Sequence, residues 1–339
     1  MSTKLKALLA TGRISNLPTV WCNCLAAALI LLYLNPLSQQ LYFSDQEFPI
    51  GTFYLLGILL LISTSLIYVG GCFLGDAIDA KFDLQHRPTR PIPSGIFNQR
   101  TIMSLAAIML IIGSILPLIF HYLQAPNHLA MSIINGNKDY GWQQITIVPY
   151  LFLAVVLYSL LHKKSSLYGL PLIGLCRFFL VLFGASIAAW LTTTYLFDSN
   201  GNEYVETQIF LTKPIIIYAS AVCIYTIAFA SVARTESSNS PITWRNLLRY
   251  TMLALPLTVL FTNQSLQVET ITALVIYAIW LSYAFAFLSK NKGNYVSKCL
   301  AGFCLLDACF VAQFGWIWVV ICLILFLSAL ALQKIAPAT

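Results

Sequence analysis

Gly75-Asp76-Ala77-Ile78-Asp79-Ala80-Lys81-Phe82-Asp83, followed by His86-Arg87-Pro88-Thr89-Arg90-Pro91-Ile92-Pro93-Ser94-Gly95, comes directly after an apolar run at 52–74. Asp76, Asp79 and Asp83 stand at positions i, i+3 and i+7 of this stretch. On a helix these positions share one face, within roughly 60° of each other. Because three like charges on one face repel each other, we expect a cationic partner there.

The residues around these aspartates predict a site for a metal-bound diphosphate. Carboxylates are hard oxygen ligands that suit Mg²⁺, which typically uses one or two of them together with substrate phosphates. Arg87 and Arg90 lie just downstream, and guanidinium groups bind phosphate oxygens in pairs. We therefore expect the three aspartates and two arginines to form the catalytic group. The alternative, a solvated loop whose charges merely end a helix, is disfavoured by this spacing and by the scarcity of charge elsewhere.

Composition places the chain in a membrane. Of its 339 residues 59% are hydrophobic and only 9% are charged, and the mean hydropathy is +0.79. A soluble domain carries about 25% charged residues. Apolar runs of nearly spanning length recur without the alternation of a barrel strand. We therefore predict one all-α domain over 1–339, a polytopic membrane bundle of nine or ten transmembrane helices around a central cavity.

The expected spans follow the apolar runs, and the first of them is interpreted as a retained span rather than a cleaved signal peptide. The last two could be one broken helix or a tight hairpin around Gln313-Phe314-Gly315. The ten segments are 17–34, 52–74, 102–121, 147–162, 168–191, 214–232, 247–262, 269–288, 298–312 and 315–333.

The charged residues predict the orientation. With the N-terminus and the motif loops in the cytoplasm, sixteen of the 19 lysines and arginines fall inside, as the positive-inside rule expects. Topology in the lipid bilayer thus accounts for the net charge of +7, and no nucleic-acid partner is expected. The membrane would be a bacterial inner membrane or its organelle equivalent. The acids expected on this side are Asp76, Asp79, Asp83 and Glu236.

The pattern G-D-x-x-D-x-x-x-D followed by R-P-x-R-P-I-P-S-G resembles the first aspartate-rich motif of the UbiA superfamily of membrane prenyltransferases. Members usually carry Asn before the first Asp, where this chain has Gly75. The resemblance implies a Mg²⁺-dependent transfer of an isoprenyl group from an allylic polyprenyl diphosphate, by ionisation to a carbocation. The acceptor stays open: an aromatic ring, a haem-like macrocycle, a phosphorylated sugar or another polar alcohol.

Further substrate-binding residues are implied by the same resemblance. Arg13 and Asn16 are similar to an N-terminal R-x-x-N of the family that faces the central cavity, although a positive-inside anchor with a helix cap would look alike. In many relatives a Tyr is followed four residues later by a Lys that contacts the diphosphate. Here Tyr158 is followed by His162, with Lys163 next to it. Either Lys163 supplies the ammonium or this contact is altered.

Two charged residues fall inside predicted spans. Arg177 needs an anionic partner there, because a buried arginine in a bilayer is expensive. A substrate phosphate or a motif aspartate would serve, and relatives often carry Arg in a similar G-x-x-R setting. For Asp307 we expect a structural partner, a hydroxyl or an interfacial lysine, rather than a catalytic role.

The sixth connection departs from the family pattern. Where the family has a second aspartate-rich motif for a second Mg²⁺, this chain offers Glu236 alone, with Arg234 as a possible phosphate clamp. The predicted metal ligands are therefore the three motif aspartates and Glu236, and one or two ions could bind. A non-catalytic isoprenoid-diphosphate binding or transport protein on the same fold is the alternative. A lipid-phosphate phosphatase or phosphotransferase would need a nucleophile, for which His86 is the nearby candidate.

Overall fold

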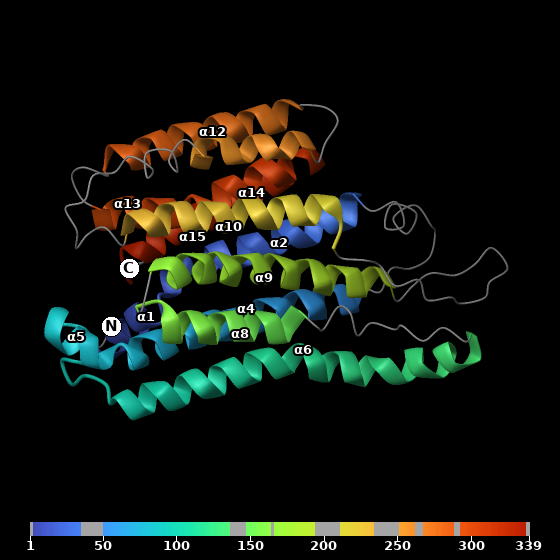
Figure 1. The fold of residues 1–339 in the computed structure, drawn as a ribbon. Helices are drawn as coiled ribbons and strands as arrows, with labels where there is room; N and C mark the ends of the chain where they lie inside the picture. Colours follow the sequence, from blue (N-terminus) through green and yellow to red (C-terminus); the bar gives the residue numbers. More distant parts are fainter. Residues whose placement is uncertain are drawn as a thin grey trace.

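The computed structural model describes residues 3–34, 50–135, 147–163, 166–193, 211–233, 251–261, 267–287 and 292–336. Within these ranges every regular element is helical. The helices run side by side as one elongated bundle, and both termini lie at the same end (Figure 1). The predicted all-α membrane bundle is confirmed, and the chain is an integral, multi-pass membrane protein; the central cavity stays a prediction.

Each predicted span overlaps at least one helix of the described ranges, but the predicted count of nine or ten transmembrane helices is not confirmed. Eight helices of the described ranges are long and apolar enough to cross a membrane, and Ile147–Leu161 and Thr251–Phe261 are shorter apolar helices. The elements are α1 (Thr3–Thr11), η1 (Ile14–Asn16), α2 (Leu17–Leu34), α4 (Ile50–Ile78), α5 (Ala80–His86), α6 (Gln99–Asn135), α8 (Ile147–Leu161), α9 (Ser166–Thr193), α10 (Lys213–Ala233), η3 (Leu255–Phe261), α12 (Val268–Ala286), α13 (Lys292–Ala301), α14 (Phe303–Val311), η4 (Ala312–Phe314) and α15 (Trp316–Gln333).

The expected break near Gly315 is a hairpin. The 3₁₀ turn η4 ends at Phe314, and Gly315 has a φ of 112°, a backbone conformation that favours glycine. The two helices on either side of this turn, α14 and α15, pack against each other. Of the two alternatives left open by the sequence, the tight hairpin is therefore the one that forms.

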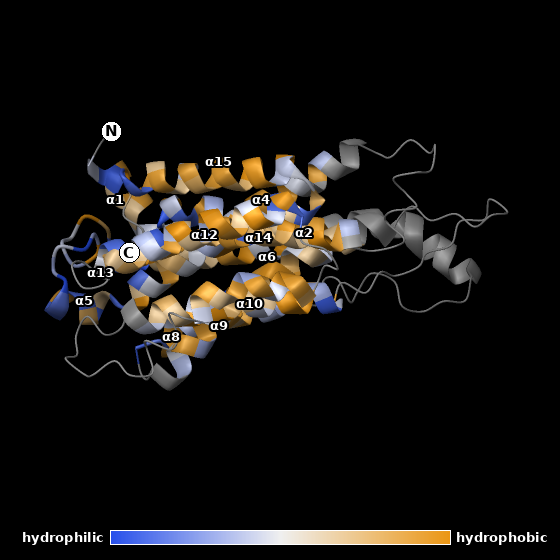
Figure 2. Ribbon diagram, turned by 90° about the horizontal axis from the view of Figure 1, so that it is seen from above, coloured by the Kyte–Doolittle hydropathy of each residue, from blue (hydrophilic) through white to orange (hydrophobic). Residues whose placement is uncertain are grey.

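Burial separates an inner set of helices from an outer set. The inner spans Gly293–Phe314 and Ile14–Tyr33 have 83% and 78% of their apolar window buried, against 22% for Trp316–Gln333. All nine residues of α14 are buried. Hydrophobic residues dominate the long helices, whereas hydrophilic residues collect at the end that holds α1 and α5 (Figure 2). Outer helices thus present apolar side chains to lipid, while polar chemistry is concentrated at one end.

Close helix contacts hold α2 and α4 in place. A Cβ added to Gly184 of α9 would lie 2.7 Å from the carbonyl oxygen of Cys24 in α2. A Cβ added to Gly70 of α4 would lie 3.2 Å from the carbonyl oxygen of Ala106 in α6. Small residues allow such close packing between membrane helices. These contacts fix the helices that carry the polar residues described next.

Candidate active site

The aspartate motif continues the path of α4 beyond the membrane span. α4 ends at Ile78, Asp79 forms a one-residue turn, and α5 begins at Ala80. The backbone N–H of Asp79 donates to Gly75 (2.9 Å), and that of Asp83 donates to Asp79 (2.9 Å), so the helical spacing is kept through the turn. The predicted i, i+3, i+7 arrangement is therefore present, and the three carboxylates share cationic partners.

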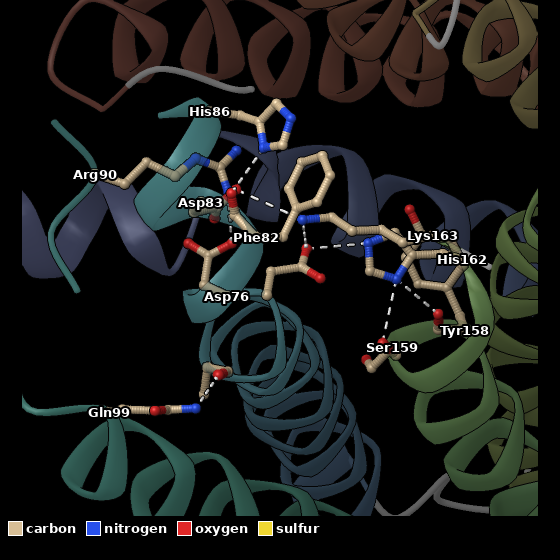
Figure 3. Close-up of polar contacts among 12 residues, drawn as sticks. Asp76, Phe82, Asp83, His86, Arg90, Gln99, Tyr158, Ser159, His162 and Lys163 are labelled. Carbon is tan, nitrogen blue, oxygen red and sulfur yellow. Dashed lines mark hydrogen bonds and ion pairs between the residues drawn. The ribbon is translucent and has the colours of Figure 1, made fainter. Parts of the chain in front are cut away.

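Arg90 returns from the Pro-rich turn to two of these carboxylates. Its Nη1 lies 2.9 Å from Asp83 Oδ2 and 3.3 Å from Asp76 Oδ1 (Figure 3). The turn that brings it back is closed by a backbone hydrogen bond from Ser94 to the Arg90 carbonyl. Arg87, by contrast, is exposed and has no ion pair with any described residue. The structure thus brings one of the two predicted arginines to the carboxylates.

The N-terminal segment supplies a second guanidinium. Arg13 Nη2 lies 3.4 Å from Asp76 Oδ1. Its φ of 48° is left-handed, a conformation found at no other non-glycine residue of the described ranges, and such backbone strain persists where surrounding structure holds it. Asn16 Nδ2 donates to the Tyr68 hydroxyl of α4 at 2.9 Å. The implied R-x-x-N residues therefore both contact the motif helix.

The end of α8 supplies an ammonium and an imidazole. Lys163 Nζ lies 2.9 Å from Asp79 Oδ2 and 3.5 Å from Asp83 Oδ1. It also lies 3.8 Å above the Phe82 ring, a cation–π contact. His162 Nε2 lies 3.1 Å from Asp79 Oδ2. Both residues thus reach the motif aspartates, and a contact of either with the diphosphate stays a prediction.

The imidazole of His162 is held by its own helix. Its Nδ1 donates to the carbonyl oxygens of Tyr158 (3.0 Å) and Ser159 (3.2 Å), and the Tyr158 ring stacks on it with centroids 5.0 Å apart. The predicted substrate-binding role of Tyr158 stays a prediction, and in the structure this residue orients His162 (Figure 3). We call the three aspartates with Arg13, Arg90, His162 and Lys163 the aspartate cluster.

Hydrogen bonds from two neighbours favour the ionised form of Asp79. Burial alone would raise the pKa of Asp79, but hydrogen bonds from His162 and Lys163 outweigh it and lower the pKa below its usual value. Asp83 is buried, yet one oxygen faces Arg90 and the other faces Lys163. A buried carboxylate is tolerated when it is paired in this way.

The carboxylate oxygens that remain accessible define the possible metal site. Among the described residues no group of three or more His, Cys, Asp or Glu side chains is placed to hold a metal ion. Asp76 Oδ2 and Asp79 Oδ1 have no partner in the described part of the chain, whereas both Asp83 oxygens are engaged. Two free carboxylate oxygens fit a Mg²⁺ that completes its shell with substrate phosphate oxygens and water. Direct ligation by Asp83 stays a prediction.

A second polar group lies inside the bundle. Arg177 of α9 donates to Asn23 Oδ1 at 2.7 Å and to Thr19 Oγ1 at 3.1 Å. Its guanidinium carbon also lies 4.5 Å from the centre of the Phe303 ring. The expected motif aspartate is therefore not its partner in the structure, and its binding of a substrate phosphate stays a prediction.

The same amide connects Arg177 to the acid of α14. Asn23 Nδ2 lies 2.9 Å from both carboxylate oxygens of Asp307, and the Tyr218 hydroxyl donates to Asp307 Oδ1 at 2.7 Å. The expectation of a hydroxyl partner for Asp307 agrees with this contact. We call Thr19, Asn23, Arg177, Tyr218 and Asp307 the buried network.

Sequence reasoning missed several of these residues, among them Asn23, Phe82 and Tyr218. Asn23 is an amide in the middle of the apolar run Leu17–Leu34, which is a signal that could have marked it as a partner for the two intramembrane charges. Phe82 and Tyr218 gave no such signal, because aromatic residues are common throughout the chain. The predicted residues Arg234 and Glu236 lie outside the described residues.

Comparison with known proteins supports the fold. No protein-family model matches the chain. A digeranylgeranylglyceryl phosphate synthase of Methanoregula boonei is 28% identical over 135 residues, which is 40% of this chain and 41% of that relative. The chain thus matches about two fifths of the length of this relative.

A solved structure, reported for the biosynthesis of digeranylgeranylglyceryl phosphate synthase in membranes, superposes with a TM-score of 0.52 at 18% identity. The superposition covers 97% of this chain and 100% of that structure. The chain therefore has the same fold as this structure. This fold agrees with the resemblance of the aspartate motif to the UbiA superfamily, and the bundle places the aspartate cluster at the end of α4.

Proposed function

We propose that the chain is a Mg²⁺-dependent intramembrane prenyltransferase that moves an isoprenyl group from an allylic polyprenyl diphosphate to an acceptor. One observation supports this most directly. Side chains from the N-terminal segment, α4–α5, the Pro-rich turn and α8 meet at one end of the UbiA-type bundle, and all of them carry or accept charge. An allylic diphosphate has an anionic head group and an apolar tail. The head group would lie at the charged end of the bundle, and the tail would lie among its apolar helices.

Five residues of the aspartate cluster would contact the metal ion or the diphosphate in this proposal. Asp76 and Asp79 would hold Mg²⁺ through their free oxygens, and the ion would neutralise negative charge that develops on the leaving diphosphate. Arg13, Arg90 and Lys163 would bind the diphosphate oxygens directly, and such charge-assisted hydrogen bonds strengthen as the C–O bond breaks.

The acceptor would then attack C1 of the isoprenyl cation, and its proton would leave to solvent or a nearby base. The name digeranylgeranylglyceryl phosphate synthase points, for the relative and the solved structure, to a geranylgeranyl donor and a glyceryl phosphate acceptor. We propose the same donor and acceptor for the present chain. The predicted cytoplasmic orientation, with the aspartate cluster inside, would give the reaction access to a water-soluble head group.

The test is release of diphosphate from purified protein in detergent. Geranylgeranyl and farnesyl diphosphates are supplied with Mg²⁺, separately with geranylgeranylglyceryl phosphate and with an aromatic acceptor. Release that needs Mg²⁺ and disappears in Asp76→Ala supports prenyl transfer, and the labelled product identifies the acceptor. Binding of the diphosphate without release, for every donor and acceptor and also with a cell extract as acceptor source, would favour a non-catalytic carrier. This alternative arises because the second motif offers Glu236 as its single acid.

Glu236 has its own test in this proposal. If it is a metal ligand, Glu236→Gln should raise the Mg²⁺ concentration needed for half-maximal release, because an amide oxygen is a weaker ligand than a carboxylate. Thr235→Val next to it serves as the control. An unchanged Mg²⁺ requirement in Glu236→Gln removes this residue from the metal site.

A further inference from the structure

We infer that Lys163 occupies the place of a second divalent cation, so that this protein binds its diphosphate with one metal ion instead of two. The inference rests on the proposed diphosphate site and concerns how its charge is balanced. It starts from the contacts of Lys163 and from the oxygens that these contacts leave available.

The position of Lys163 is fixed from three sides. Its ammonium lies between Asp79 (2.9 Å) and Asp83 (3.5 Å), and the Phe82 ring covers it at 3.8 Å. The residue is exposed at the end of α8, but these three contacts hold its ammonium over the carboxylates. A cation that bridges two carboxylates has the place that a bridging metal ion would take (Figure 3).

The charges of the cluster already balance without a metal ion. The carboxylates of Asp76, Asp79 and Asp83 face the guanidinium groups of Arg13 and Arg90 and the ammonium of Lys163. An aspartate-rich face without such cations would need divalent ions to relieve its repulsion. Here Arg13, Arg90 and Lys163 relieve the repulsion between the aspartates. Additional positive charge is needed only to neutralise the incoming diphosphate.

The ligand supply points the same way. Both Asp83 oxygens are taken by Arg90 and Lys163, and within the described ranges only Asp76 Oδ2 and Asp79 Oδ1 are left for a metal. The stretch 234–250 contains Glu236 as its single acid. Two Mg²⁺ ions would each need at least one carboxylate as well as substrate oxygens. Asp76 and Asp79 together can give one ion two carboxylate ligands, whereas two ions would leave each with a single aspartate.

The structure therefore gives Asp83 a positioning role. It is buried at 2% exposure and contacts Arg90 and Lys163 at once. By holding both cations it keeps their remaining N–H groups available to the diphosphate. Arg90 and Lys163 come from the Pro-rich turn and the end of α8, so Asp83 also ties these two segments together.

The experiment counts metal ions per bound diphosphate. The full-length protein in detergent is saturated with the non-ionisable thiolodiphosphate analogue of geranylgeranyl diphosphate and titrated with Mn²⁺. Unbound ligands are removed on a short desalting column, and retained Mn²⁺ and analogue are quantified. The Mn²⁺ electron paramagnetic resonance spectrum separates an isolated ion from an exchange-coupled pair. We expect one isolated Mn²⁺ per bound analogue.

Variants of Lys163 test its part. Lys163→Met should weaken analogue binding about tenfold at low Mn²⁺, the loss of one charge-assisted hydrogen bond. At high Mn²⁺ a second ion should enter the vacated place and produce the exchange-coupled signal. Lys163→Arg should keep one ion. The matched control is Lys81→Met, an exposed lysine of α5 with no ion pair among the described residues, which should behave like wild type.

Two outcomes overturn the inference. One is the binding of two Mn²⁺ ions per analogue in the wild type. The other is a Lys163→Met variant whose affinity for the analogue is unchanged and which binds a single ion at all Mn²⁺ concentrations. Thermal melting of Lys163→Met and Lys163→Arg separates these results from misfolding. Failure of the wild type to bind the analogue with or without metal would instead remove the proposed function itself, and this inference with it.

Discussion

The aspartate cluster and the buried network are both sets of charges on membrane helices, yet their surroundings differ. In the cluster, Arg13 and Lys163 are about one third exposed, and carboxylate oxygens stay open to further partners. In the network, Asn23 and Asp307 are completely buried, and every contact is made within the protein. A charge that can exchange its partner can bind a ligand, whereas one that is permanently paired holds helices together.

The difference also lies in what joins opposite charges. Lys163 and Arg90 touch carboxylates directly, so an incoming anion can compete for them. Arg177 and Asp307 are joined through the amide of Asn23, whose oxygen accepts from the guanidinium while its nitrogen donates to the carboxylate. The bridging amide pairs both charges without bringing them into contact. We therefore expect substitutions in the two regions to change different measurements.

The largest effect is expected from the cluster. Asp79→Ala should lower diphosphate release by about 10³-fold, because the metal loses a ligand and Lys163 loses its closest carboxylate. The melting temperature in detergent should stay near that of wild type, since Asp79 lies outside the packed core. A variant that melts far earlier would place Asp79 with the structural charges and weaken the comparison.

The next effect belongs to the network. Asn23→Leu should destabilise the protein by about 3–5 kcal/mol, because it leaves Arg177 and Asp307 buried without their shared partner. Chemical or thermal unfolding in detergent measures this loss. Thr226→Val is the control, since the Thr226 hydroxyl bonds only to its own helix at Val222.

A combined variant sharpens this second prediction. Replacing Asn23, Arg177 and Asp307 together by apolar residues of similar volume should recover much of the lost stability, because no buried charge is then left unpaired. If diphosphate release also survives, the network is structural. Loss of release in a well-folded triple variant would instead give Arg177 the phosphate-binding role predicted from the sequence.

A smaller effect is expected at Phe82. Phe82→Leu removes the aromatic face above Lys163, and the KM for the allylic diphosphate should rise about two- to fivefold while kcat changes little. Steady-state kinetics with varied donor provides the measurement. Leu84→Ala, another exposed apolar residue of α5, is the matched control. Equal changes in both variants would show that α5 packing, rather than the cation–π contact, is responsible.

The smallest effect concerns pH. The pKa of Asp79 is lowered in the folded protein, so its ion pairs add stability that is present above the usual carboxyl pKa of about 4 and is lost as the pH falls through the lowered value. Asp79→Asn should melt roughly one to two degrees below wild type at pH 6, and this gap should close near pH 3. A gap of the same size at both pH values would contradict the assignment.

Several features could be read directly from the residues. The helical bundle follows from apolar runs of spanning length, because a backbone in lipid must satisfy its hydrogen bonds within each helix. The shared face of Asp76, Asp79 and Asp83 follows from the helical period, which persists through the turn at Asp79. The hydroxyl partner of Asp307 follows from the cost of an unpaired acid in a bilayer, which made some polar contact necessary.

The tertiary structure alone decided which cations reach which acids. That Lys163 and Arg90 meet at Asp83, and that Arg177 bonds to Asn23 instead of a motif aspartate, depends on how α2, α4, α8 and α9 pack. Sequence separation does not determine such pairings, since helix packing is set by shape, as at Gly184 against Cys24. The sequence by itself therefore determined that charges must be paired. Packing chose the partners, and with them the division between a site for a ligand and a fixed structural network.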